Sequence, residues 1–188
     1  MSDDLRQPAR ITPGTDPKAD KLWSMIKDID VAMMTTFDGD HLRARPMWCS
    51  NDLFDGSLYF FTRRSSSKVA EIGRDTHVGL AFAKPGDQNY VSVSGHARVV
   101  TDRGLMKELW REPMRTWFPK GTDDPDMALI TVTAEAAEYW DSPSASMVFL
   151  YGYAKALLTG EPPHPGENEK LGNTGTTSVD ADRRTWNA

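Results

Sequence analysis

The chain has 188 residues, a net charge of −5 and a pI of about 5.4, with 39% hydrophobic and 26% charged residues. This length suits one globular domain with flanking arms, and the acidic charge disfavours nucleic acid or an anionic membrane as a partner. The single cysteine, Cys49, excludes an intramolecular disulfide. Because no signal sequence and no apolar run of about 18–20 residues is visible, we expect a cytoplasmic protein.

The pattern of apolar and turn-forming residues divides the chain into an arm, a domain and a tail. Residues 1–17 are rich in proline and predict an N-terminal arm, followed by a domain over 18–160. Apolar spacing predicts helices at 18–29, 67–74, 103–111 and 144–158, and a loop over 112–126. Alternating or β-branched runs predict strands at 31–37, 41–49, 57–62, 78–83, 90–100, 128–133 and 137–140. Proline, glycine and polar residues over 161–188 predict a flexible C-terminal tail, disordered or extended.

These elements predict a mainly β fold with some α-helix. Six or seven strands joined by short turns favour an antiparallel, Greek-key-like β-barrel with small helices at the barrel ends. The connections are too short for the crossovers of a parallel sheet. In the strand over 90–100, alternate residues are apolar, and Gly95 in its middle predicts a bulge or a sharp bend.

The most informative stretch, Leu58 to Ile72, reads as a strand, a cationic turn rich in serine, and a helix start. Free N–H groups and the positive end of a helix dipole create an anion site at such a position. Lys68 in the first helical turn opposes that dipole, which costs about 0.3–1 kcal/mol unless an anion compensates. The turn is therefore a candidate phosphate site; the alternative is an exposed basic loop with a serine cap.

An ordered set of segments resembles the FMN-binding split-barrel family related to pyridoxamine 5′-phosphate oxidase, and most closely its general stress protein 26 branch. The segments are Arg43–Met47, Tyr59–Ile72, Val91–Val99 and Ala137–Asp141, with Trp117–Gly121 also fitting that branch. The resemblance covers about residues 18–166. It implies a split barrel, non-covalent FMN with FAD as the alternative, and a homodimer carrying the flavin at the subunit interface.

The resemblance also implies which residues contact the cofactor. They are Arg43, Arg45, Pro46, Met47, Phe61, Thr62, Ser66, Ser67, Lys68, Tyr90 and Trp140. Ser66, Ser67 and Lys68 match a Ser-Arg-Lys phosphate clamp whose arginine is Ser67 here, so phosphate affinity is lower or Arg63 or Arg64 substitutes. Trp140 matches a tryptophan that approaches the flavin from the other subunit, whereas Trp110 and Trp117 are interpreted as packing residues.

One departure from the oxidase bears on function. Where the oxidase has arginines that hold its phosphorylated substrate, residues 141–147 contain none, which weakens an oxidase assignment. We therefore expect an FMN-dependent oxidoreductase or flavin reductase with a nicotinamide donor, bound transiently because no GxGxxG fingerprint is present. The alternative is a flavin-binding or storage module without turnover, since no catalytic acid or base can be named. No histidine has a partner at metal-ligand spacing, so no metal site is expected; we interpret His96 as a structural histidine and Cys49 as a buried one.

Overall fold

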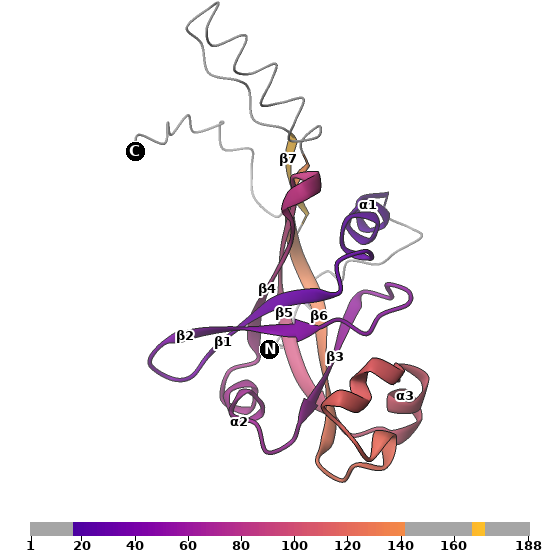
Figure 1. Cartoon of the computed structure of the whole chain (residues 1–188). Helices are drawn as coiled ribbons and strands as arrows, with labels where there is room; N and C mark the ends of the chain where they lie inside the picture. Colours follow the sequence, from indigo (N-terminus) through magenta and orange to yellow (C-terminus); the bar gives the residue numbers. More distant parts are fainter. Residues whose placement is uncertain (1–16, 142–166, 172–188) are drawn as a thin grey trace, which may run out of the picture.

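The computed structural model describes residues 17–141 and 167–171 (Figure 1). The α-helices are α1 (Pro17–Ile26), α2 (Ser67–Arg74) and α3 (Arg103–Glu108). The strands are β1 (Val31–Phe37), β2 (Leu42–Trp48), β3 (Ser57–Arg63), β4 (His77–Lys84), β5 (Asn89–Val100), β6 (Met127–Asp141) and β7 (Glu167–Leu171). Three short 3₁₀ turns are η1 (Pro85–Asp87), η2 (Glu112–Thr116) and η3 (Gly121–Asp123).

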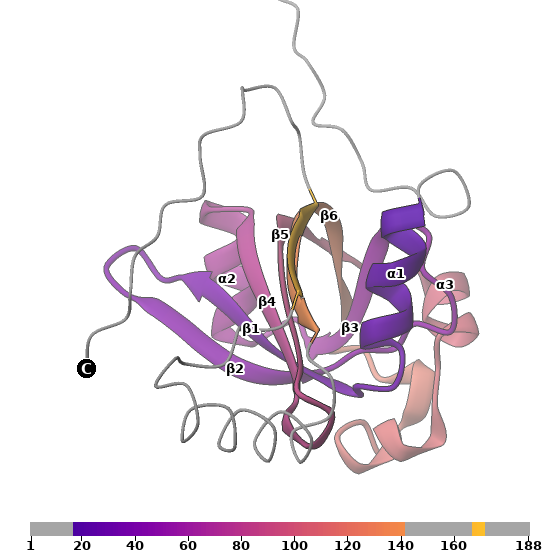
Figure 2. The ribbon, with the colours of Figure 1, turned by 90° about the horizontal axis from the view of Figure 1, so that it is seen from above.

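All strands join one antiparallel sheet in the order β2-β1-β4-β5-β6-β3, and β7 pairs with the far part of β6. The sheet curls into a half-barrel, so that its two outer strands meet again at a bridge between Cys49 and Phe60. Helices α1 and α2 both contact the central strand β5 and lie far apart, toward opposite ends of the curled sheet (Figures 1 and 2). The predicted mainly β, split-barrel architecture is confirmed.

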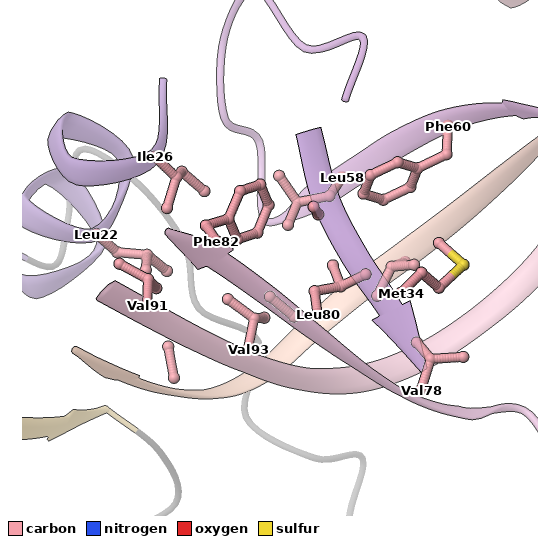
Figure 3. Packing of buried hydrophobic residues seen from close by; sticks show 14 of the residues in the cluster. Leu22, Ile26, Met34, Leu58, Phe60, Val78, Leu80, Phe82, Val91 and Val93 are labelled. Atoms are coloured by element: carbon pink, nitrogen blue, oxygen red, sulfur yellow. The ribbon is translucent and has the colours of Figure 1, made fainter. Parts of the chain in front are cut away.

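The inner face of the curled sheet holds the main core. Along β1 the buried residues are Ala32, Met34 and Thr36, while their neighbours point outward. Figure 3 shows side chains from α1, β1, β3, β4 and β5 directed into one interior. The predicted alternation of β5 holds, with Val91 and Val93 buried and the intervening Ser92 exposed. A second apolar cluster lies where α3 and η2 cover β3 and β6.

Gly95 forms the predicted irregularity in the long β5–β6 pair. The register shifts between Ser94 and Gly95, which leaves Glu135 of β6 without a direct partner in the ladder. A Cβ at Gly95 would lie 2.0 Å from the carbonyl oxygen of Thr133, so only glycine fits this close approach of backbones. The bulge lies between the part of β6 that pairs with β3 and the part that pairs with β7.

The structure corrects several predicted boundaries. The first helix ends at Ile26, and a turn brings Ile29 into the core. The predicted loop over 112–126 contains η2 and η3; Met114 in η2 is buried, and so is Phe118 between the two turns. Within the predicted C-terminal tail, residues 167–171 are extended and form β7, which pairs with β6. The predicted helix over 144–158 lies outside the described residues, and none of the described helices is long and apolar enough to cross a bilayer.

Candidate functional site

A cavity of about 540 Å³ opens where the barrel splits between β2 and β3. The two strands touch at Cys49 and Phe60 and then diverge. Residues 46–48 therefore line the cavity from β2, and residues 61–63 line it from β3. This volume falls within the range of small-molecule sites, roughly 300–1,000 Å³.

One end of the cavity is polar because the start of α2 faces it. Lys68 Nζ donates to Thr62 Oγ1 over 3.3 Å, and Thr62 Oγ1 lies 3.1 Å from Ser66 Oγ. Ser66 is the N-cap residue of α2, but its side chain does not cap the helix, and the first turn holds no acidic residue. A cation and the uncapped positive end of a helix thus border the same cavity.

The half-buried Lys68 ammonium has no compensating carboxylate within 4 Å among the residues described. Burial lowers the pKa of Lys68, and the charge of Arg45 lowers it further, while Glu71 acts in the opposite direction. The folded protein therefore holds this positive charge at some cost. An anion bound at this end of the cavity would remove that cost.

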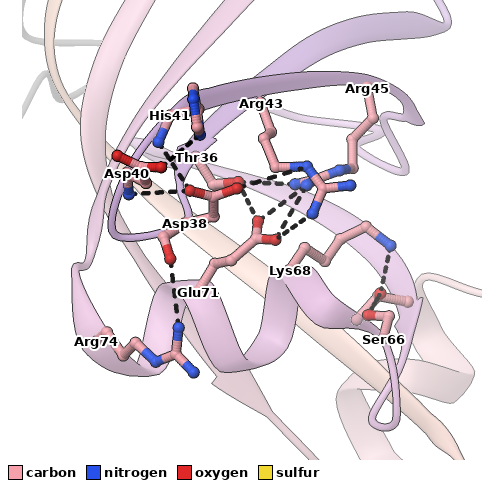
Figure 4. Close-up of polar contacts among 11 residues, drawn as sticks. Thr36, Asp38, Asp40, His41, Arg43, Arg45, Ser66, Lys68, Glu71 and Arg74 are labelled. Atoms are coloured by element: carbon pink, nitrogen blue, oxygen red, sulfur yellow. Dashed lines mark hydrogen bonds and ion pairs between the residues drawn. The ribbon is translucent and has the colours of Figure 1, made fainter.

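Beside the cavity, the buried Glu71 carboxylate binds two arginines (Figure 4). Its oxygens lie 2.9 Å from Arg45 Nη2 and 3.3 Å from Arg43 Nη1, and Thr36 Oγ1 donates to it over 2.6 Å. Burial alone would raise the pKa of Glu71, but the hydrogen bonds from Thr36 and Arg45 and the two arginine charges bring it below its ordinary value. The two arginines therefore flank α2 and do not line the cavity; Arg43 and Ser67 border a separate polar depression.

The cationic turn before α2 is held from outside by Asp126. The Asp126 carboxylate accepts from the Ser65 N–H over 3.0 Å and from Ser65 Oγ over 2.8 Å, so this hydroxyl already has a partner. Of the two arginines that could replace the missing clamp arginine, Arg63 lines the cavity. Arg64 borders a shallow depression elsewhere.

The outer wall of the cavity comes from the 112–118 segment, which supplies Met114, Trp117 and Phe118. Met114 and Phe118 are buried, whereas Trp117 is 53% exposed. Sequence reasoning assigned Trp117 to packing and missed this position at the cavity. The sequence feature that could have indicated this position is the pair Trp117-Phe118 inside a loop rich in proline and glycine.

Six of the eleven predicted cofactor residues line the cavity: Pro46, Met47, Phe61, Thr62, Ser66 and Lys68. Tyr90 and Trp140 do not line the cavity. They pair with each other where β5 begins and β6 ends. Trp140 is 38% exposed on the outer face of the sheet. Within one chain these two residues stay apart from the cavity.

The remaining candidates have structural surroundings. His96 Nδ1 lies 2.7 Å from Thr76 Oγ1, outside the cavity, as expected of a structural histidine. Burial raises the pKa of the Cys49 thiol to about 11, which leaves it unreactive at neutral pH. In the described part of the chain, no three His, Cys, Asp or Glu residues cluster closely enough to hold a metal ion.

Comparison with known proteins decides the family. Residues 17–164 match the family described as "Pyridoxamine 5′-phosphate oxidase like". The chain belongs to this family. The resemblance predicted from the ordered motifs is thereby confirmed.

Individual proteins that this chain resembles agree with this placement. Protein bli-3 of Neurospora crassa is 28% identical over 158 residues, which is 78% of this chain and 76% of that protein. A general stress FMN/FAD-binding protein from Xanthomonas citri shares 28% identity and a TM-score of 0.61, over 67% of this chain and 89% of that one. A protein assigned as general stress protein 26 from Jannaschia sp. CCS1, 24% identical, has the same fold with a TM-score of 0.66, over 82% of this chain and 98% of that one.

Proposed function

We propose that this chain binds flavin mononucleotide non-covalently in the cavity between β2 and β3. The observation that carries the proposal is Lys68, a half-buried cation at an uncapped helix start with no carboxylate partner among the described residues. The rest of the cavity is lined mainly by apolar and aromatic side chains. FMN has the matching chemistry, with a phosphate at one end and a planar ring at the other. The similar protein from Xanthomonas citri, 28% identical, is described as FMN/FAD-binding, which supports a flavin as the ligand.

Each part of the cavity would then have one role. Lys68 and Ser66 would hold the phosphate, with the α2 N-terminus contributing its free N–H groups. Pro46, Met47 and Phe61 would contact the ring and its ribityl chain. Arg45, although bound to Glu71, adds positive potential near Lys68. When bound, the flavin supplies the hydride and electron chemistry, and the protein supplies binding and orientation.

The activity we propose is that of an FMN-dependent oxidoreductase or flavin reductase that takes electrons from a nicotinamide. A flavin module without turnover is the second candidate. Among the described residues that line the cavity there is no aspartate, glutamate, histidine, cysteine or tyrosine, and the one lysine, Lys68, is assigned to the phosphate end. This lining limits the first candidate to reactions that need no proton donor beside the ring, such as transfer of a hydride to the flavin, and it is also compatible with the second. Oxidation of NADH or NADPH by the FMN-loaded protein separates the two candidates.

The exposed outer face of the sheet supports a homodimer. Exposed apolar residues gather there on the β1–β2 hairpin: Val31, Met33, Phe37 and Leu42. The register continues from Met33 across β4 and β5 through Ala81, Ser92 and Glu138. Trp140 lies two residues beyond Glu138 and so faces the same side. Two such faces packed about a twofold axis would bury this apolar surface and give the Trp140 of each subunit a route to the cavity of its partner.

Absorption spectroscopy of the purified protein tests the cofactor directly. We expect flavin bands, and mass spectrometry of the released ligand should give FMN and not FAD. Apoprotein should then bind FMN saturably with a Kd of about a micromolar or tighter. A titration that shows no saturation at tens of micromolar FMN contradicts the proposal. Pyridoxamine 5′-phosphate should give negligible turnover, because residues 141–147 carry no arginine.

A further inference from the structure

The aromatic wall of the cavity is built from a segment remote in sequence from the strands that form the rest of it. The Trp117 and Phe118 N–H groups both donate to the Met114 carbonyl, each over 3.0 Å, which closes a tight turn. Phe118 packs beside Phe61, with ring centroids 6.4 Å apart, and is 3% exposed. Burial of Phe118 thus anchors the turn, while the Trp117 side chain stays half-exposed at the cavity.

Arg63 connects this wall to the cationic turn. Its Nη2 donates to the Trp117 carbonyl over 2.6 Å, and its guanidinium lies 5.4 Å from the Phe118 ring centroid. Its Nη1 is 3.8 Å from the Asp126 carboxylate, which also holds Ser65. Arg63 is the last residue of β3. Its side chain therefore contacts both the 112–118 segment, which carries Trp117, and Asp126, which holds the cationic turn.

The charge of Arg63 is only partly compensated. Its one carboxylate contact among the described residues is the 3.8 Å pair with Asp126, and Asp126 also accepts two hydrogen bonds from Ser65. Its side chain is 50% exposed and borders the same cavity as Lys68. Arg64, the next residue, contacts neither the wall nor the cavity in the described structure.

We propose that Trp117 is the ring-binding wall of this cavity and that Arg63 sets its preference for a phosphorylated flavin. Arg63 fixes Trp117 through the carbonyl of that residue and presents its remaining charge to the phosphate end. This inference rests on the proposed flavin binding. It adds two residues to the site. Trp117 contacts the ring, and Arg63 acts on the ring through Trp117 and on the phosphate through its charge.

Titration of FMN and of riboflavin into apoprotein tests the proposal, because riboflavin has the ring without the phosphate. Trp117→Ala should weaken both ligands by the same factor, about 5- to 30-fold, through loss of stacking and buried area. Trp117→Phe keeps an aromatic face and should stay within about threefold of the wild-type protein for both ligands. Arg63→Ala should weaken FMN at least about tenfold more than riboflavin.

Two further variants serve as matched comparisons. Arg63→Lys keeps the charge and should keep the ratio of FMN to riboflavin affinity, whereas Arg64→Ala should change neither ligand. Unchanged affinities in Trp117→Ala overturn the role of the wall. Equal losses for both ligands in Arg63→Ala, or the same ratio change in Arg64→Ala, overturn the role of Arg63.

The wild-type titration and thermal melting of each apoprotein keep these outcomes interpretable. Wild-type protein that binds neither ligand contradicts the proposed function itself. If an alanine variant fails to fold, Trp117→Phe and Arg63→Lys still decide the matter. A loss of FMN affinity beyond threefold in Trp117→Phe, or a changed ligand ratio in Arg63→Lys, counts against the inference.

Discussion

The Glu71 carboxylate lies 2.9 Å from the Arg45 guanidinium, and its side chain is only 4% exposed. The positive charges of the arginines compensate the buried Glu71 carboxylate, and the carboxylate compensates the partly buried Arg45 charge. Removing one member of such a pair leaves a desolvated charge without compensation. The pair therefore makes Glu71 a strong determinant of how the β1–β2 hairpin packs on α2.

We expect Glu71→Ala to lower the free energy of unfolding by about 2–4 kcal/mol, since Arg45 would lose its only carboxylate partner in the described structure. Arg43→Ala is the matched control, because the Arg43 side chain is half-exposed and its ion pair should be worth less than about 1 kcal/mol. Urea unfolding of the three apoproteins measures both effects. Equal losses in the two variants would contradict the assignment of Glu71 as the buried centre of the network.

The lowered pKa of Glu71 predicts how this contribution changes with pH. Its pKa in the folded protein lies below the ordinary value of 4.5, so its stabilising contribution is fully present above that value. It is lost as the pH falls through the folded pKa. The difference in unfolding free energy between wild type and Glu71→Gln should thus be constant at neutral pH and shrink below about pH 4.5. A difference that grows on acidification would show that the pKa is raised.

The bulge at Gly95 predicts a paired result for two glycines. Gly95→Ala places a Cβ against the Thr133 carbonyl and should destabilise the protein by about 1–3 kcal/mol or more. Gly73→Ala, in α2, meets nothing within 4 Å and should be neutral or stabilising by up to about 1 kcal/mol. Thermal melting of both variants measures the contrast. Equal melting temperatures would mean that β5 and β6 can separate at the bulge without loss.

Features encoded locally were predictable from the sequence. The alternation of β5, the bulge at Gly95 and the strand–turn–helix around Lys68 each depend on residues that are neighbours along the chain. Such patterns follow from backbone geometry and side-chain periodicity. They were sufficient to predict a mainly β antiparallel barrel and a cationic turn before α2, whereas the split barrel was predicted from the family resemblance.

The missed features depend on contacts between distant residues. Asp126 holds Ser65 across 61 positions, and Arg63 reaches Trp117 across 54. Glu71 reads in the sequence as an ordinary polar residue of a helix, and only the fold brings it to Arg45. Pairings of this kind require the relative placement of elements, which no local pattern contains.

The proposed dimer through the outer face of the sheet gives a further prediction. Met33 is 41% exposed at the centre of the apolar face, and Met33→Asp should convert a species of twice 21.0 kDa into a monomer. FMN binding should weaken with it, because each site would lose the partner subunit's contribution. Leu53→Asp is the control, since Leu53 is 79% exposed in the turn between β2 and β3 and lies outside this face. Light scattering that finds wild-type protein monomeric at micromolar concentration with flavin bound would refute the dimer.

Lys68 gives the sharpest test of the phosphate site. Its charge-assisted hydrogen bond to a phosphate should be worth about 1.5–3 kcal/mol, so Lys68→Ala should weaken FMN by roughly 10- to 150-fold. Riboflavin has no phosphate and should bind the variant as it binds the wild type. Lys107→Ala, on the exposed face of α3, is the control for a general loss of positive charge.

The stability of the Lys68→Ala apoprotein separates a binding role from a structural one. Burial and the charge of Arg45 lower the pKa of Lys68, so the folded apoprotein holds this positive charge at some cost. Alanine also removes a cation from the positive end of α2 and is the better helix former. The melting temperature should therefore stay level or rise while FMN affinity falls. A lower melting temperature with equal weakening of FMN and riboflavin would assign Lys68 to folding, and unchanged binding of both would leave it as a solvated loop residue.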